Sequence, residues 1–130
     1  MKFELIPKNI IEKISSDLIT DCVIVSIYSA AENEPSIAAN EHIKNALFIN
    51  CDNTIDKIQS ELINRFVNEY VNLPLCIITY DDDSYLFCDS VAAALRYIHN
   101  GSRELSNRKI NTNIYYNMLN SYYNPTRKFD

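Results

Sequence analysis

The sequence predicts an α/β domain of three layers, a mainly parallel sheet with helices on both faces. Three runs of apolar and β-branched residues, at 22–28, 46–50 and 75–80, indicate buried strands of a parallel sheet. Between them, apolar residues recur every three or four positions, as in amphipathic helices. Strands that alternate with helices favour a parallel sheet covered on both sides. At 130 residues, 47% of them hydrophobic, the chain is long enough for one domain over 1–130.

Composition excludes several classes of function. The chain carries 12 basic and 17 acidic side chains, and this net charge of −5 disfavours non-specific binding to nucleic acid or anionic membranes. No apolar stretch approaches the ~20 residues that span a bilayer, and no signal peptide is expected at the N-terminus. With only Gly101 for glycine, a glycine-rich phosphate loop is excluded. We expect a cytoplasmic or nuclear protein.

The four cysteines form no C-x-x-C pair, and no histidine stands at zinc-finger spacing from them. Reduced, partly buried thiols are therefore expected, with no metal and no cofactor.

In chain order, apolar residues at helical spacing after Pro7 predict a short amphipathic helix over about 8–18. The strand at 22–28 follows, then a loop over 29–40 that contains Pro35. The short strand at 46–50 comes next.

The longest helix is predicted over 54–72. Its apolar spacing places Ile58, Leu62, Phe66 and Tyr70 on the face expected to be buried. Because truncating a buried leucine leaves a cavity, Leu62→Ala is expected to cost about 2–5 kcal/mol.

The strand at 75–80 is expected to be central. A loop over 81–88 and a helix capped by Asp89 follow it, and Gly101 suits the left-handed position that ends such a helix. A polar segment, a last strand over 113–117 and a short helix complete the prediction.

The loop that follows the central strand is the candidate site, since α/β proteins hold anions or nucleophiles between a strand end and a helix start. Its chemistry is wrong for an anion, because three adjacent carboxylates would repel one. Cys88 is the only thiol nearby, and Arg96 lies too far along the helix to close the loop. The loop residues of interest are Asp81, Asp82, Asp83, Ser84 and Cys88.

The motif order resembles the rhodanese-like fold, and within it the N-terminal domain of MAP-kinase phosphatases, related to cell-division-cycle phosphatases. EHIKNALFI at 41–49 is similar to the family's GHIxGAxNI, CDNTI at 51–55 to its CNTI, and IITYDD at 77–82 to its VIVYDE. The resemblance covers nearly the whole chain and implies a single rhodanese-like domain. It also implies that His42 is structural, whereas His99 is expected at the surface.

Several departures bear on activity. Ser26 and Tyr28 stand where the family usually has aspartate and arginine, and Asn45 replaces a glycine. Active members of the family carry cysteine directly after the central strand, where this chain has Asp81. Six residues later stands Phe87, where a phosphatase has arginine.

The resemblance therefore implies an inactive protein-binding or regulatory domain, belonging to a dual-specificity phosphatase or pseudophosphatase, with a protein kinase as partner. Related domains dock kinases through a basic cluster after CNTI, and only Lys57 is basic at that place. The other candidates for partner binding are Arg65, Arg103, Arg108 and Lys109. The alternative is a sulfurtransferase or cysteine-dependent phosphatase that uses Cys88. The oligomeric state stays open.

Overall fold

The computed structural model describes residues 1–29, 34–51, 57–102 and 109–125. Four strands form one sheet of order β1-β4-β2-β3, in which every neighbouring pair is parallel. The strands are β1 (Lys2–Pro7), β2 (Cys22–Tyr28), β3 (Ile43–Asn50) and β4 (Leu75–Tyr80). The predicted α/β class and the inner position of β4 are thereby confirmed.

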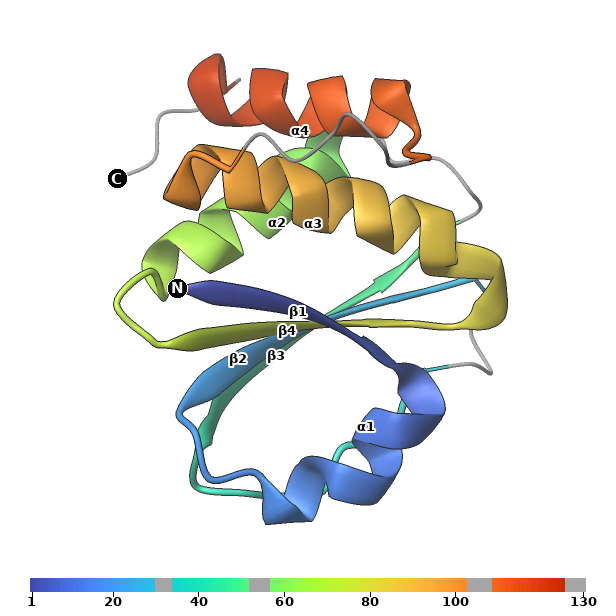
Figure 1. Ribbon diagram of the computed structural model, residues 1–130, viewed down its shortest axis with the longest axis vertical. Coiled ribbons are helices and arrows are strands. Elements are labelled where there is room, and N and C mark those ends of the chain that lie inside the picture. The colour runs from blue at the N-terminus through green and yellow to red at the C-terminus, as the bar shows by residue number, and fades with distance from the viewer. Residues whose placement is uncertain (30–33, 52–56, 103–108, 126–130) are drawn as a thin grey trace.

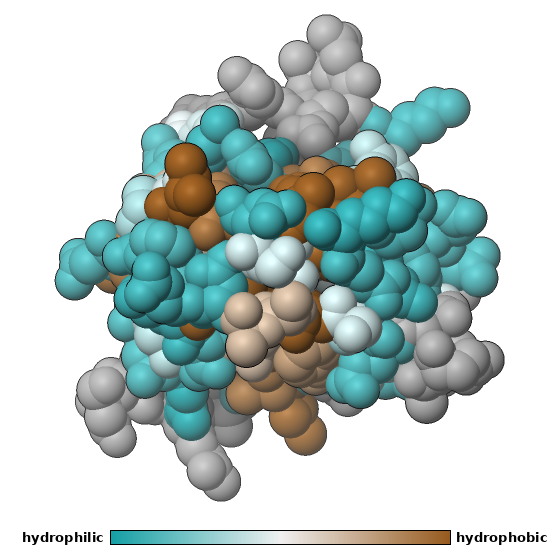
Figure 2. Space-filling model, turned by 90° about the horizontal axis from the view of Figure 1, so that it is seen from below, coloured by the Kyte–Doolittle hydropathy of each residue, from teal (hydrophilic) through white to brown (hydrophobic). Residues whose placement is uncertain are grey.

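Helices cover both faces of the sheet, as predicted (Figure 1). One face carries α1 (Lys8–Ile14), which continues into a 3₁₀ turn. The other carries α2 (Lys57–Glu69) and α3 (Tyr85–Asn100), with α4 (Thr112–Tyr123) packed on their outer side. Figure 2 shows the molecule from the α1 side, where patches of apolar side chains lie among hydrophilic ones.

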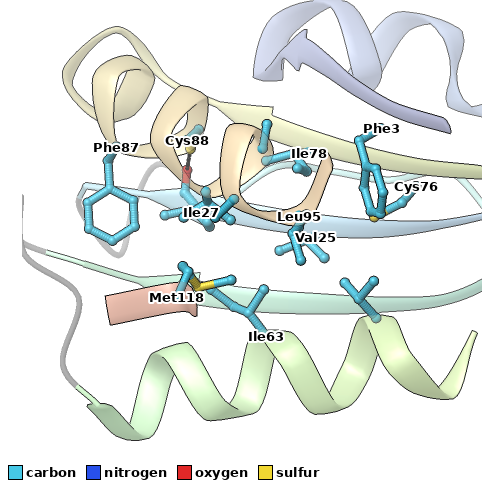
Figure 3. Packing of buried hydrophobic residues seen from close by; sticks show 14 of the residues in the cluster. Phe3, Val25, Ile27, Ile63, Cys76, Ile78, Phe87, Cys88, Leu95 and Met118 are labelled. Carbon is cyan, nitrogen blue, oxygen red and sulfur yellow. Dashed lines mark hydrogen bonds between the residues drawn. The ribbon is translucent and has the colours of Figure 1, made fainter. Parts of the chain in front are cut away.

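The core follows from the two-residue period of the inner strands. Val25 and Ile27 of β2, with Ile78 of β4, point toward α2 and α3 (Figure 3). Ile24 and Ile77 point to the opposite face and pack against α1. Because both faces are covered, these strands are apolar at nearly every position.

The predicted strand over 113–117 is wrong, because this segment lies in α4. Asn111 caps the helix: its Oδ1 accepts the N–H groups of Asn113 and Ile114 at 3.0 and 3.2 Å. Residues three and four apart are buried below the cap, namely Ile114, Tyr115, Met118 and Ser121. The cap and this spacing outweigh the strand preference of isoleucine and tyrosine.

Strand β1 was not predicted, because a six-residue edge strand carries a weak pattern. It pairs with β4 from Lys2 to Pro7, and Phe3 enters the core. Two side chains of α3 bond the N-terminal segment. Arg96 Nη2 donates to the Phe3 carbonyl at 2.7 Å, and Asn100 Nδ2 donates to the Met1 carbonyl at 3.0 Å.

Helix α3 begins five residues earlier than predicted, at Tyr85. Asp89, expected as its cap, is buried within the helix, as is Ser90. The predicted loop over 81–88 is instead a 3₁₀ turn, Asp82–Ser84, followed by the first helical turn. Gly101 ends the helix with φ 67°, the left-handed conformation expected of it.

The buried face of α2 agrees with the prediction in part. Phe66 is buried and Tyr70 packs against the core, as predicted, but Ile58 and Leu62 are not buried. Ile58 is 76% exposed and Leu62 45% exposed, whereas Ile63 is fully buried. Apolar residues occur on two sides of this helix, so spacing alone does not select the side that meets the sheet. The buried residues of α2 are Ser60, Ile63, Asn64, Phe66 and Val67.

Two adjacent substitutions test this assignment of the α2 face. Ile63→Ala is expected to lower the free energy of unfolding by about 2–5 kcal/mol, because it leaves a cavity in the core. Leu62→Ala is expected to lower it by less than about 1 kcal/mol, as at a surface position. Urea denaturation measures both, and equal losses would show that the buried face is misassigned.

Candidate functional site

The candidate site lies at the carboxyl edge of the sheet, where β2 and β4 end side by side. After β2 the chain goes on to β3 at the sheet edge, and after β4 it enters α3 on one face. Ligands of parallel α/β sheets bind where the chain diverges in this way. The residues that follow the two strands are Ser29 and Asp81.

The Asp81 carboxylate joins these two strand ends. Its Oδ2 accepts hydrogen bonds from the main-chain N–H and the hydroxyl of Ser29, both at 2.9 Å. Its Oδ1 accepts the N–H of Ser84 at 2.8 Å, and Ser84 Oγ in turn accepts the N–H of Asp81 at 3.0 Å. This reciprocal pair is a capping box for the 3₁₀ turn. The sequence analysis did not predict it, because the usual signature has Glu or Gln, and not Ser, three residues after the cap.

These contacts fix the ionisation of Asp81. Burial raises the pKa of this carboxyl, but the hydrogen bonds from Ser29 and Ser84 lower it more, so the net pKa lies below the ordinary value. Asp81 is therefore ionised at neutral pH. Three donors, the N–H and hydroxyl of Ser29 and the N–H of Ser84, bond this carboxylate. The Asp81 side chain therefore occupies the donors that an external anion would need.

Cys88 lies one turn into α3 and is fully buried. Its thiol lies 3.8 Å from the carbonyl oxygen of Ile27 (Figure 3). It also faces the carbonyl oxygen of Thr79 at 3.7 Å and the hydroxyl of Ser84 at 3.8 Å. Burial raises the pKa of Cys88 far above its usual range. Such a thiol is neutral and inert, because nucleophilic attack requires an accessible thiolate.

The remaining predicted loop residues do not complete a catalytic set. Asp82 and Asp83 are exposed, and Ser84 is buried with its hydroxyl 3.0 Å from the Ile27 carbonyl, to which it donates. Phe87 points into the core. Arg96 is bonded to β1, as described above, and does not close the loop.

His42 precedes β3 and so lies at the amino ends of the strands, whereas Asp81 lies at their carboxyl ends. Its Nδ1 lies 2.8 Å from Asp21 Oδ1, and its carbonyl accepts the N–H of Cys22 at 2.9 Å. The hydrogen bond with His42 is the main cause that lowers the pKa of Asp21. These contacts agree with the structural role expected of this histidine.

His99 is half-buried, not a surface residue as expected. Its ring lies between those of Phe3 and Tyr122, with centroid distances of 5.8 and 5.6 Å. Burial lowers its pKa, and so it is a neutral packing residue at pH 7.

The predicted partner-binding residues do not form one described cluster. Lys57 and Arg65 are exposed on α2, whereas Lys109 lies in the segment before α4. Arg103 and Arg108 lie outside the described residues. What the sequence did not indicate is the exposure of Ile58 and Leu62 beside Lys57 and Arg65.

Within the described ranges, no group of three or more histidine, cysteine, aspartate or glutamate side chains is arranged to hold a metal. Nor is any helix among them long and apolar enough to cross a membrane. Comparisons with protein-family models, with curated proteins and with solved structures find no match. The fold and the site thus define an α/β domain whose carboxyl-edge loop is closed by an internal carboxylate.

The Asp81 contacts predict a pH-dependent contribution to stability. Asp81→Asn is expected to lower the free energy of unfolding at pH 7 by about 1–3 kcal/mol, as for hydrogen bonds to a charged group. Because the folded pKa is depressed, this contribution is present above the unfolded pKa of ~3.9 and is lost as pH falls through the folded pKa.

Denaturant titrations of the wild type and Asp81→Asn between pH 7 and pH 3 measure the difference. Asp82→Asn, at an exposed neighbour, is the matched control and is expected to change little. A gap between wild type and Asp81→Asn that is constant over this range would contradict the assignment.

Proposed function

We propose that this chain is a catalytically inactive, rhodanese-like protein-binding or regulatory domain of the kind found in dual-specificity phosphatases or pseudophosphatases. The observation that carries the proposal is the Asp81 carboxylate, held by Ser29 and Ser84 where a transfer enzyme would need a nucleophile and a free anion site. The all-parallel sheet with helices on both faces is compatible with that fold.

Transfer of a sulfur atom or a phosphoryl group requires a nucleophile at the start of the loop and donors that face the transferred group. Here the donors that converge at the loop already bond Asp81, and Asp82 and Asp83 add negative charge beside them. An incoming anion would have to displace an internal carboxylate and approach two more.

The alternative, an enzyme that uses Cys88, is not favoured by any contact of this residue. A nucleophile there would need solvent access and a stabilised thiolate, whereas the Cys88 thiol faces two carbonyl oxygens inside the core. Its position supports a packing role.

The surface best suited to a protein partner is the outer side of α2. There Ile58 and Leu62 expose apolar area next to Lys57 and Arg65. Exposed apolar groups with charged neighbours are typical of protein-binding surfaces.

A protein kinase is the partner that the resemblance suggests, with Lys57 and Arg65 as its contacts. These two cations alternate with Glu61 and Glu69 along the helix, so the surface lacks the strong positive field of a basic docking cluster. Single exposed ion pairs contribute only about 0–1 kcal/mol. A partner with apolar groups and charges of both signs fits this surface better.

Transfer assays that compare the wild type with Cys88→Ser test whether the domain lacks catalytic activity. Wild-type protein is expected to release no thiocyanate from thiosulfate and cyanide, and no product from a chromogenic aryl phosphate, beyond the level of Cys88→Ser. Iodoacetamide is expected to alkylate Cys88 at pH 7 only after unfolding, because the native thiol is buried and neutral.

Peptide mass spectrometry of native and urea-unfolded protein follows the alkylation of each cysteine. Turnover that Cys88→Ser abolishes would show that the domain is an enzyme. Rapid native alkylation of Cys88 would show that this thiol is accessible and would contradict the packing role.

A further inference from the structure

His99 lies where three elements meet: the start of β1, the last turn of α3 and the last turn of α4 (Figure 1). Its imidazole packs between the rings of Phe3 on β1 and Tyr122 on α4. Phe3 is buried, and so is the Nε2 atom of His99, which has no hydrogen-bond partner among the described residues. The imidazole thus joins β1 to α4 by ring packing while one of its nitrogens stays without a partner.

A proton on this imidazole would be poorly compensated. An imidazolium carries an N–H on both ring nitrogens, so Nε2 would become a charged donor without an acceptor in a buried position. Burying an unpaired charge costs more than burying an unpaired neutral nitrogen. In agreement, the pKa of His99 is lowered by burial and, to a smaller extent, by the positive charge of the Met1 amine.

No carboxylate in the described parts of β1, α3 and α4 is placed to stabilise an imidazolium at His99. Glu4 pairs with Lys2 at 2.8 Å, and because both alternate with Phe3 along β1, they lie on the other face of the sheet. Asp89 lies ten residues earlier on α3, about 15 Å along the helix. The titratable side chains of α4 are all tyrosines, which are neutral at acidic pH. Arg103, Glu104 and Arg108 lie outside the described residues.

Two features would favour the charged form, the end of α3 and the two aromatic rings. A helix end attracts cations through its unbonded carbonyls, but here Gly101 and Ser102 donate their N–H groups to the carbonyls of Tyr97 and Arg96 at 3.0 and 3.3 Å. Ring faces also attract cations, yet this attraction supplies no acceptor for Nε2. Burial therefore remains the larger effect.

We propose that His99 is a pH-sensitive contact: its neutral imidazole holds the last turn of α4 against β1 and α3, and protonation releases that turn. Release lets the imidazolium reach water. Strand β1 stays in place, because the bonds from Arg96 and Asn100 to its carbonyls do not titrate in this pH range. This inference is independent of the proposed function.

The lowered pKa sets the direction of the pH dependence. Since the pKa of His99 in the closed form lies below the ordinary value of ~6.5, the released form takes up a proton first as pH falls. Release is therefore insensitive to pH above ~6.5 and becomes up to about tenfold more favourable for each pH unit below it. The change levels off once pH falls below the pKa of the closed form.

Hydrogen exchange of main-chain amides, followed by NMR, measures this release. The N–H of Asn124 bonds the Asn120 carbonyl at 2.8 Å and reports on the last turn of α4, whereas the Ile63 amide reports on the buried side of α2. After correction for the intrinsic exchange rate, the opening constant at Asn124 is expected to rise about three- to tenfold from pH 6.5 to pH 5.5. Ile63 is expected to stay more protected than Asn124 at each pH.

The two histidines of the chain provide a matched pair of variants. His99→Phe keeps a ring between Phe3 and Tyr122 but cannot titrate, so the opening constant at Asn124 is expected to be the same at both pH values. His42→Gln removes the other imidazole and is expected to keep the pH dependence of the wild type. Circular dichroism checks that both variants are folded.

The ring C–H signals of His99 in the wild type give a test that needs no variant. We expect this imidazole to titrate below ~6.5. Titration at or above that value would overturn the proposal, because the folded structure would then stabilise the imidazolium. A pH dependence that persists in His99→Phe, or equal protection of Asn124 and Ile63, would also overturn it. The inactive-domain proposal depends on the transfer assays with Cys88→Ser and is unaffected by these results.

Discussion

The structure depends most on the carboxylate of Asp81, which links the segment after β2 to the start of α3. Both strands are parallel and end at the same edge, so Ser29 after β2 and Asp81 after β4 lie side by side. Asp81 satisfies donors from both sides while it caps the turn that leads into α3. The strand ends at which parallel α/β sheets usually bind ligands are here joined to each other by an internal carboxylate.

The same contacts also explain why Cys88 is buried. Because the 3₁₀ turn that Asp81 caps leads directly into α3 at Tyr85, Cys88 falls on the first turn of α3 and faces inward. A helix capped by Asp89, as predicted, would have left Cys88 in a loop, with more access to solvent. Asp81, by capping the turn, thus determines that Cys88, seven positions further on, is buried.

The inner strands could be predicted from the sequence because both of their faces are buried, which makes a run such as Val23 to Ile27 apolar at every position but one. Edge strand β1 and helix α4 could not be predicted from the sequence. The first is short and half-covered, and the second has residues that favour strands but a cap that favours a helix. On α2, exposed Leu62 and buried Ile63 are adjacent and chemically alike, so only packing separates them.

The position of the candidate site along the chain could be predicted from the sequence, but its hydrogen bonds could not. The position of Asp81 after β4 follows from the strand pattern, whereas its bond to Ser29, 52 residues away in the chain, depends on which strands are neighbours.

The most direct test of the account is an NMR titration of the Asp81 carboxyl, combined with phosphate titration of the Ser29 and Ser84 amides. We expect Asp81 to titrate below the ordinary value of ~3.9 and the two amides to be unaffected by phosphate at neutral pH. A carboxyl that titrates at or above that value, with amide shifts that saturate as phosphate is added, would show that the loop still binds anions and would contradict the account.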